Sequence, residues 1–125
     1  MFRIGIIGAG WIAHKMCCAI APFEDMEVYA IASRTKEKAA AFAAEHNVAS
    51  AYGSYEEMVR DPKVDLVYVA TPHSHHFEHA MLALENGKPV LVEKAFTANA
   101  AQAEKLIATA REKGLFITEA IWTRY

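Results

Sequence analysis

The sequence has 125 residues, of which 54% are hydrophobic and 22% charged, and its formal net charge is -2. This length accommodates one domain with a real core and leaves no room for a second domain of similar size. The 13 basic residues face 15 acidic ones and form no basic run, so we expect no nucleic-acid partner. The sequence has no apolar run of about 20 residues, the length needed to cross a bilayer, so we expect no membrane partner either. These features indicate an ordinary soluble globular domain.

Cys17 and Cys18 are neighbours in sequence, match no metal-ligand spacing and are too few for a disulfide framework. We therefore expect a cytoplasmic protein. One alternative is that residues 3–21, a basic residue followed by an apolar stretch and small residues, form a secretory signal. The glycines of this stretch and the polar pair His14 and Lys15 favour a strand, a turn and a helix instead.

Short apolar runs alternate with helical segments along the whole chain. The runs predict strands at residues 2–7, 27–32, 51–52, 64–70, 89–93 and 115–118. The segments between them predict helices at residues 10–21, 35–46, 54–60, 74–86 and 99–113. With right-handed crossovers, this alternation predicts an α/β fold with a doubly wound, parallel, six-stranded sheet in the order 3-2-1-4-5-6, the Rossmann arrangement.

Capping residues support these boundaries. Thr35 can begin a helix, Ser54 and Glu57 can form a capping box, and Gly87 and Gly114 can supply the left-handed residue that ends a helix. A doubly wound sheet binds ligands outside the carboxyl ends of its strands. We therefore expect the site in the loops after the first, second, fourth and fifth strands.

Residues 8–13 read G-A-G-W-I-A and lie between the first predicted strand and the first predicted helix. They fit the G-x-G-x-x-A dinucleotide fingerprint, in which Gly8 permits a tight turn, Gly10 leaves room for a pyrophosphate and Ala13 allows close helix-strand packing. Backbone amides at the helix start, where Trp11 and Ile12 lie, would meet the phosphates at the positive end of the helix dipole. The alternative interpretation is that the glycines only make a tight turn.

The end of the second predicted strand indicates which dinucleotide is bound. NAD-binding domains usually carry an acid there, whereas this chain reads S-R-T-K at residues 33–36. Arg34 can pair with a 2′-phosphate and stack on adenine, Ser33 can donate a hydrogen bond, and Lys38 is a further candidate. We therefore expect NADP as the cofactor, with NAD as the alternative. A solvated basic helix start is the competing interpretation, disfavoured because cations there oppose the helix dipole.

Four histidines crowd the start of the fourth predicted helix: His73, His75, His76 and His79. A zinc site needs three or four convergent ligands, and no cysteine or second histidine group completes one, so we expect no metal site. Instead, we expect residues 71–73 to turn the chain at the sheet edge. The loop residues Thr71, Pro72 and His73, together with His76, would then lie near the cofactor, while His79 faces solvent or packs.

Glu93 and Lys94 end the fifth predicted strand at the same edge. A charged pair at a strand end is usually only solvated. Here it would emerge beside the nicotinamide, where a partly desolvated lysine can exchange a proton with a substrate hydroxyl or carbonyl.

Together, these residues resemble the Gfo/Idh/MocA family of sugar and related oxidoreductases. The resemblance runs the whole chain and rests on the glycine loop, residues 32–34, residues 51–57, Thr71-Pro72 with His76, and Glu93-Lys94. It implies that Lys94 is the catalytic lysine of a Glu-Lys-Pro motif. Residues 114–124 are most similar to the branch containing dimeric dihydrodiol dehydrogenase and NADP-dependent xylose dehydrogenase, which implies that Trp122 reaches the pocket. Two residues depart from the family pattern: Ala95 replaces the motif's proline, and His73 replaces the asparagine usual after Thr-Pro.

The resemblance implies hydride transfer between a nicotinamide and a carbinol carbon of a sugar or cyclic diol, with Lys94 assisting proton transfer. Members of the family carry a second, substrate-binding domain. The implied organisation is therefore a cofactor domain at residues 1–125, inactive alone, within a longer enzyme that forms a homo-oligomer. Two alternatives remain: a nucleotide-binding module without catalysis, and an isolated folding domain without activity.

Overall fold

The computed structural model describes residues 1–94 and 99–120. Ala95 and Trp122, which the sequence analysis singled out, lie outside the described residues. In chain order the elements are β1 (Phe2–Ile7), α1 (Trp11–Ile20), β2 (Met26–Ala32), α2 (Lys36–His46), β3 (Ser50–Tyr52), α3 (Tyr55–Val59), β4 (Leu66–Val69), the 3₁₀ turn η1 (His73–His75), α4 (His76–Glu85), β5 (Val90–Glu93), α5 (Ala100–Lys113) and β6 (Ile117–Ala120).

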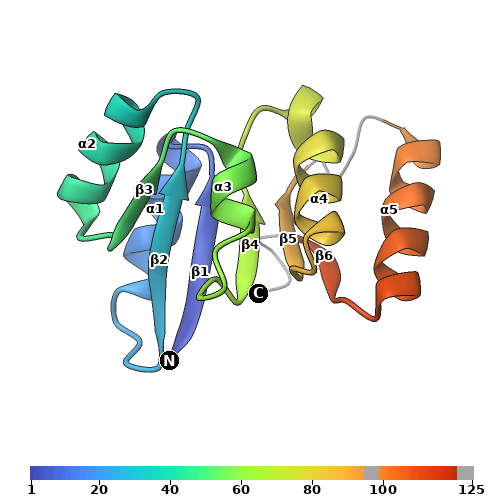
Figure 1. The fold of residues 1–125 in the computed structure, drawn as a ribbon, viewed down its shortest axis with the longest axis horizontal. Coiled ribbons are helices and arrows are strands. Elements are labelled where there is room, and N and C mark those ends of the chain that lie inside the picture. Colours follow the sequence, from blue (N-terminus) through green and yellow to red (C-terminus); the bar gives the residue numbers. More distant parts are fainter. Residues whose placement is uncertain (95–98, 121–125) are drawn as a thin grey trace.

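The described strands form one parallel sheet of six in the order β3-β2-β1-β4-β5-β6 (Figure 1). This confirms the predicted doubly wound, Rossmann-type α/β fold. The register aligns the carboxyl ends of the central strands, because Ile7 pairs with Ala32 on one side and with Val69 on the other. The loops that follow these strands therefore start from one edge of the sheet.

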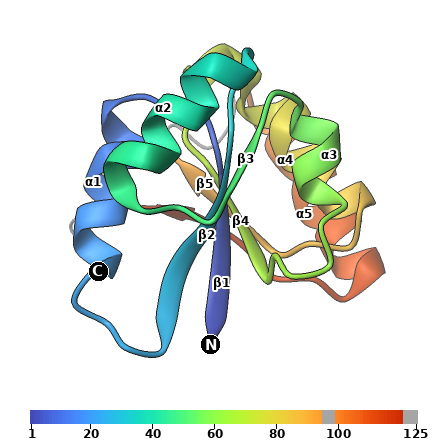
Figure 2. The same ribbon diagram turned by 60° about the vertical axis from the view of Figure 1, so that its left-hand side comes forward.

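Helices cover both faces of the sheet: α1 and α2 lie on one face, and α3, α4 and α5 lie on the other (Figure 2). The strands are buried from both sides, which explains their nearly continuous apolar sequences. Helices α1 and α2 pack against Ile6, Ile31 and Tyr68. The helices on the other face of the sheet pack against Val67 and Val69. Ile6 and Ile31 are fully buried, and each such side chain contributes about 1.5–3 kcal/mol to folding.

Several predicted boundaries differ from the structure by one or two residues; the fourth strand, for example, begins at Leu66 instead of residue 64. The sixth strand begins at Ile117, two residues later than predicted, because the backbone of Leu115 still donates a hydrogen bond to the Ala110 carbonyl and completes the end of α5. The fourth helix begins with the turn η1 before α4 starts at His76.

The predicted caps are present in the structure. Thr35 accepts a hydrogen bond from the Lys38 amide, and Gly114 ends α5 in the left-handed region. Ser54 accepts from the Glu57 amide, as in a capping box, but its own hydroxyl donates to the carboxylate of Glu56. Among the described helices, none is both long enough and apolar enough to cross a membrane.

Candidate functional site

A glycine turn joins β1 to α1. Gly8 has a φ of +105°, which side-chain-bearing residues rarely adopt. A Cβ added there would lie 3.0 Å from Thr71 Cγ2 and 3.1 Å from the Ala70 carbonyl carbon. Gly8 therefore allows the turn after β1 to approach the loop after β4. Ala13, in the first turn of α1, is fully buried, as close packing of α1 on the sheet requires.

The start of α1 is a suitable anion site. Among the described residues, no side chain caps this helix, and its first turn contains no acid. A Cβ built on Gly10 would meet no described atom within 4 Å, so the space beside the helix start is open. Amide N–H groups at an uncapped helix start need acceptors, and a pyrophosphate supplies them. The residues here therefore fit the diphosphate of a dinucleotide.

The basic segment after β2 lies at the same edge of the sheet. Ser33 is buried, with 4% of its surface exposed, whereas Arg34 and Lys38 are exposed. Lys36 is held elsewhere, because its Nζ donates a 2.6 Å hydrogen bond to the Ala51 carbonyl. Arg34 and Lys38 are thus the two cations available at this edge, and Lys36 helps to join α2 to β3.

Tyr55 follows β3 and adds an aromatic side chain to this basic segment. Burial raises the pKa of its hydroxyl, and the positive charge of Arg34 acts in the opposite direction. Its ring lies 4.6 Å from the ring of His79, measured between centroids. The predicted site did not include Tyr55, because nothing in the sequence around it indicates contact with α4.

Two histidines of α4 hold the loop after β4. His76 is fully buried, and its Nε2 lies 2.7 Å from the Thr71 carbonyl oxygen. The Nδ1 of His79 lies 2.8 Å from the Thr71 hydroxyl. Burial lowers the pKa of His79 to about 4, and the nearby His75 acts in the same direction, so His79 is neutral near pH 7. The role of His76 beside the cofactor stays a prediction.

Glu93 and Lys94 differ in their surroundings at the end of β5. Glu93 is buried, with 6% exposed, and its carboxylate accepts a hydrogen bond from the Tyr68 hydroxyl. The Glu93 side chain is therefore buried at the sheet edge and is held by a residue of the neighbouring strand β4. Lys94 is exposed and begins the turn after β5. An exposed lysine beside a buried, anchored carboxylate suits a proton donor that a substrate can reach.

These segments surround a cavity of about 800 Å³, within the range of small-molecule sites. Of the predicted residues it is lined by Gly8, Gly10, Trp11, Ile12, Ser33, Arg34, Lys38, Thr71, Pro72, Glu93 and Lys94. The sequence prediction missed Ala9, Thr35, Tyr55, Ala70, His75 and His79, which also line it. Five separate segments of the chain thus meet at the edge where a doubly wound sheet binds its ligand.

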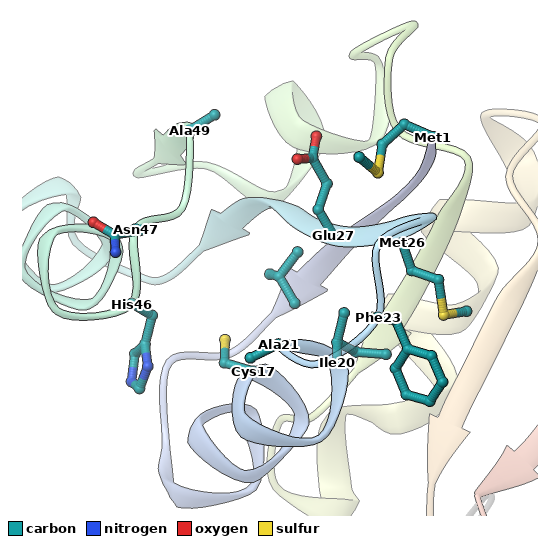
Figure 3. Close-up of a pocket in the computed structure, with 11 residues that line it drawn as sticks. Met1, Cys17, Ile20, Ala21, Phe23, Met26, Glu27, His46, Asn47 and Ala49 are labelled. Carbon is teal, nitrogen blue, oxygen red and sulfur yellow. The ribbon is translucent and has the colours of Figure 1, made fainter.

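A smaller cavity of about 330 Å³ lies near the amino end of β2, between the ends of α1 and α2 (Figure 3). Its lining is mainly apolar and includes Ile20, Phe23 and Met26. It contains neither the glycine turn nor the basic segment after β2. The larger cavity is therefore the candidate site.

A family model for the oxidoreductase family with an NAD-binding Rossmann fold matches residues 2–120. The chain belongs to the Gfo/Idh/MocA oxidoreductase family. This confirms the family resemblance and the prediction that the chain is the nicotinamide-dinucleotide-binding part of an oxidoreductase.

Relatives within the Gfo/Idh/MocA family cover nearly the whole chain. D-xylose 1-dehydrogenase (NADP⁺) of Hypocrea jecorina is 52% identical over 97% of this chain and 34% of its own length. Trans-1,2-dihydrobenzene-1,2-diol dehydrogenase of Xenopus tropicalis is 46% identical over 97% of this chain and 37% of its own length. A 3-ketoreductase from Actinomadura kijaniata, solved with NADP and TDP-benzene, is 38% identical and matches 94% of this chain and 36% of its own with a TM-score of 0.89. The chain thus spans about a third of the length of these relatives.

Proposed function

We propose that this chain is the cofactor-binding domain of an NADP-dependent dehydrogenase that acts on the CH–OH group of a sugar or cyclic diol. The observation that carries the proposal is the position of Arg34. Its exposed guanidinium lines the cavity after β2, at the place where NAD-specific domains usually hold an acid. The relatives named for NADP-dependent xylose oxidation and for dihydrodiol oxidation support both the cofactor and the substrate class.

The adenosine end of the cavity suits a 2′-phosphate. A guanidinium binds a phosphate through two parallel hydrogen bonds, and Lys38 adds a second positive charge from the first turn of α2. Ser33 lines the same cavity beside Arg34. The amides at the start of α1 bind the diphosphate, with Trp11 and Ile12 at the cavity wall.

The other end of the cavity suits the proton-transfer step. A bound nicotinamide supplies the hydride chemistry. Lys94 Nζ would accept the proton that the substrate hydroxyl releases on oxidation and would return it to the carbonyl oxygen in the reverse reaction, while Tyr68 donates a hydrogen bond to Glu93 beside it. Lys94 is exposed among the described residues. In the complete enzyme, a bound substrate and a further part of the protein would exclude water from its amine.

The share of its relatives' length that this chain covers supports a second domain in the complete enzyme. A second domain would supply the substrate contacts, and the complete enzyme would be a cytoplasmic homo-oligomer. The cofactor domain alone would bind the dinucleotide and turn over little or no substrate, because half of the substrate pocket belongs to the second domain.

Calorimetric titration of NADPH and NADH into the protein that carries this chain tests the proposal. We expect tighter binding of NADPH, and in Arg34→Ala a loss of NADPH affinity of about 10- to 100-fold with little change for NADH. Lys36→Gln is the matched control, because it removes a nearby positive charge whose amine contacts Ala51 instead. Equal affinity for both cofactors, or an equal loss in the control, contradicts the proposed role of Arg34.

A further inference from the structure

A second group of possible ligand atoms lies outside the cofactor cavity. His14 of α1 and His46 at the end of α2 face each other, and Glu45 precedes His46. One ligand atom from each of these three residues lies within 4.8 Å of the other two. The sequence pattern carries no sign of this group, because the two histidines are 32 residues apart. Packing of α1 beside α2 brings them together.

The distances are close to those of a metal site. His14 Nδ1 lies 3.1 Å from His46 Nε2. Two nitrogens bound to one tetrahedral zinc ion at about 2.0–2.1 Å would be separated by about 3.3 Å. The Glu45 carboxylate lies 4.0 Å from His46 Nε2, and its side chain is 69% exposed, so rotation can bring the oxygen closer.

Both rings are already oriented by other contacts. The His46 ring packs on Phe42, with centroids 4.4 Å apart, and only 11% of the His46 side chain is exposed. A metal-bound His14 Nδ1 requires that the ring proton sit on Nε2. This Nε2–H lies 3.8 Å from Cys18 Sγ and can donate a hydrogen bond to the sulfur. The ligands therefore need little ordering before they bind an ion.

We propose that His14, His46 and Glu45 form a surface site for a zinc ion that links α1 to α2, with water completing the coordination. Two imidazoles and one carboxylate are a donor set that zinc prefers, whereas magnesium requires oxygen ligands. A hydrogen bond between the two rings accounts for the same separation without an ion. The experiment must distinguish these two states.

The test is calorimetric titration of Zn²⁺ into the protein that carries this chain, prepared without a histidine tag and with excess Mg²⁺ present. We expect saturable binding, weakened at least about tenfold in His14→Gln and in His46→Gln and less in Glu45→Gln. His75→Gln is the matched control, because it alters the histidine group beside the cofactor cavity instead. Glu104→Gln is the control for an exposed glutamate on a different helix.

An anomalous difference map at the zinc edge, from crystals of the unaltered protein grown with Zn²⁺, gives a second measurement that needs no variant. We expect a peak between His14 Nδ1 and His46 Nε2. Absence of saturable binding overturns the proposal, as does an affinity that falls in His75→Gln and not in His14→Gln. A map with zinc only at other sites also overturns it.

Discussion

The Nδ1 atom of His79 lies 2.8 Å from the hydroxyl oxygen of Thr71, while His76 contacts the carbonyl of the same residue at 2.7 Å. Two side chains of α4 thus hold both the side chain and the backbone of one loop residue. Thr71 also lies against Gly8, so the glycine turn and the loop after β4 are positioned together. The wall of the cofactor cavity therefore depends on two buried histidines that lie on the helix behind it.

The stability of this region should depend on pH through His79. Burial lowers its pKa to about 4, against a value of 6.5 for an unperturbed histidine. Between pH of about 4 and 6.5, His79 therefore binds a proton in the unfolded chain but not in the folded chain. The contribution of neutral His79 to the free energy of unfolding is fully present above pH of about 6.5. It is lost as the pH falls towards about 4, by a total of about 3 kcal/mol.

Urea unfolding at about pH 7 and about pH 5 measures this effect. Between these values we expect the unaltered protein to lose about 2 kcal/mol more than His79→Gln, because glutamine does not titrate. The carboxylates titrate in both proteins, so their contribution cancels in the difference. An equal loss in the two proteins would show that His79 does not carry the pH dependence.

The fold was predictable because its signals are local. Most of the buried strands are nearly continuous apolar runs, and residues such as Thr35 and Gly114 mark the helix ends within a few positions. Parallel strands joined by right-handed crossovers then leave few arrangements. The sixth strand was misplaced because Leu115 is apolar, like a strand residue, yet its amide completes α5.

The site was only partly predictable, because some of its contacts join distant parts of the chain. Arg34 and Lys94 follow strands directly, so the topology alone places them at the ligand edge. Tyr55 and His79 belong to different helices, and their contact depends on how α3 packs against α4. The sequence indicated that His79 would face solvent or pack, and the structure shows that it is buried, with 8% exposed.

The buried pair formed by Tyr68 and Glu93 should be important for stability. Tyr68→Phe removes the hydrogen bond from the Tyr68 hydroxyl to a carboxylate that is only 6% exposed, and we expect a loss of about 1–3 kcal/mol in the free energy of unfolding. Tyr52→Phe is the matched control, because it removes a 2.7 Å hydrogen bond to the less buried carboxylate of Asp61. Chemical denaturation measures both, and a cost for Tyr68→Phe no larger than that of the control contradicts the argument.

Gly8→Ala should damage both the fold and the cofactor site. Its Cβ would occupy space 3.0 Å from Thr71 Cγ2, at a φ that alanine resists. Gly87→Ala is the control: Gly87 also has a positive φ, +76°, but a Cβ there meets no described atom within 4 Å. We expect Gly87→Ala to cost about 1 kcal/mol and Gly8→Ala at least about 1 kcal/mol more, with weaker NADPH binding only in the latter. Equal costs and unchanged binding would mean that the turn tolerates a side chain.

The role of Lys94 distinguishes a catalytic domain from a binding module. If Lys94 exchanges the substrate proton, Lys94→Met in the complete enzyme should lower turnover about 100- to 10,000-fold, equivalent to roughly 3–5 kcal/mol of transition-state stabilisation. The affinity for NADPH should change little, because the proposed phosphate contacts, Arg34 and the start of α1, lie at other positions around the cavity. Lys113→Met, an exposed lysine at the end of α5, is the matched control and should keep full activity. Steady-state kinetics with a sugar or diol that the unaltered enzyme oxidises, together with calorimetric titration of NADPH, measure both quantities. Turnover in Lys94→Met equal to that of the control would mean that Lys94 is an ordinary charge at the end of a strand, and another group would have to move the proton.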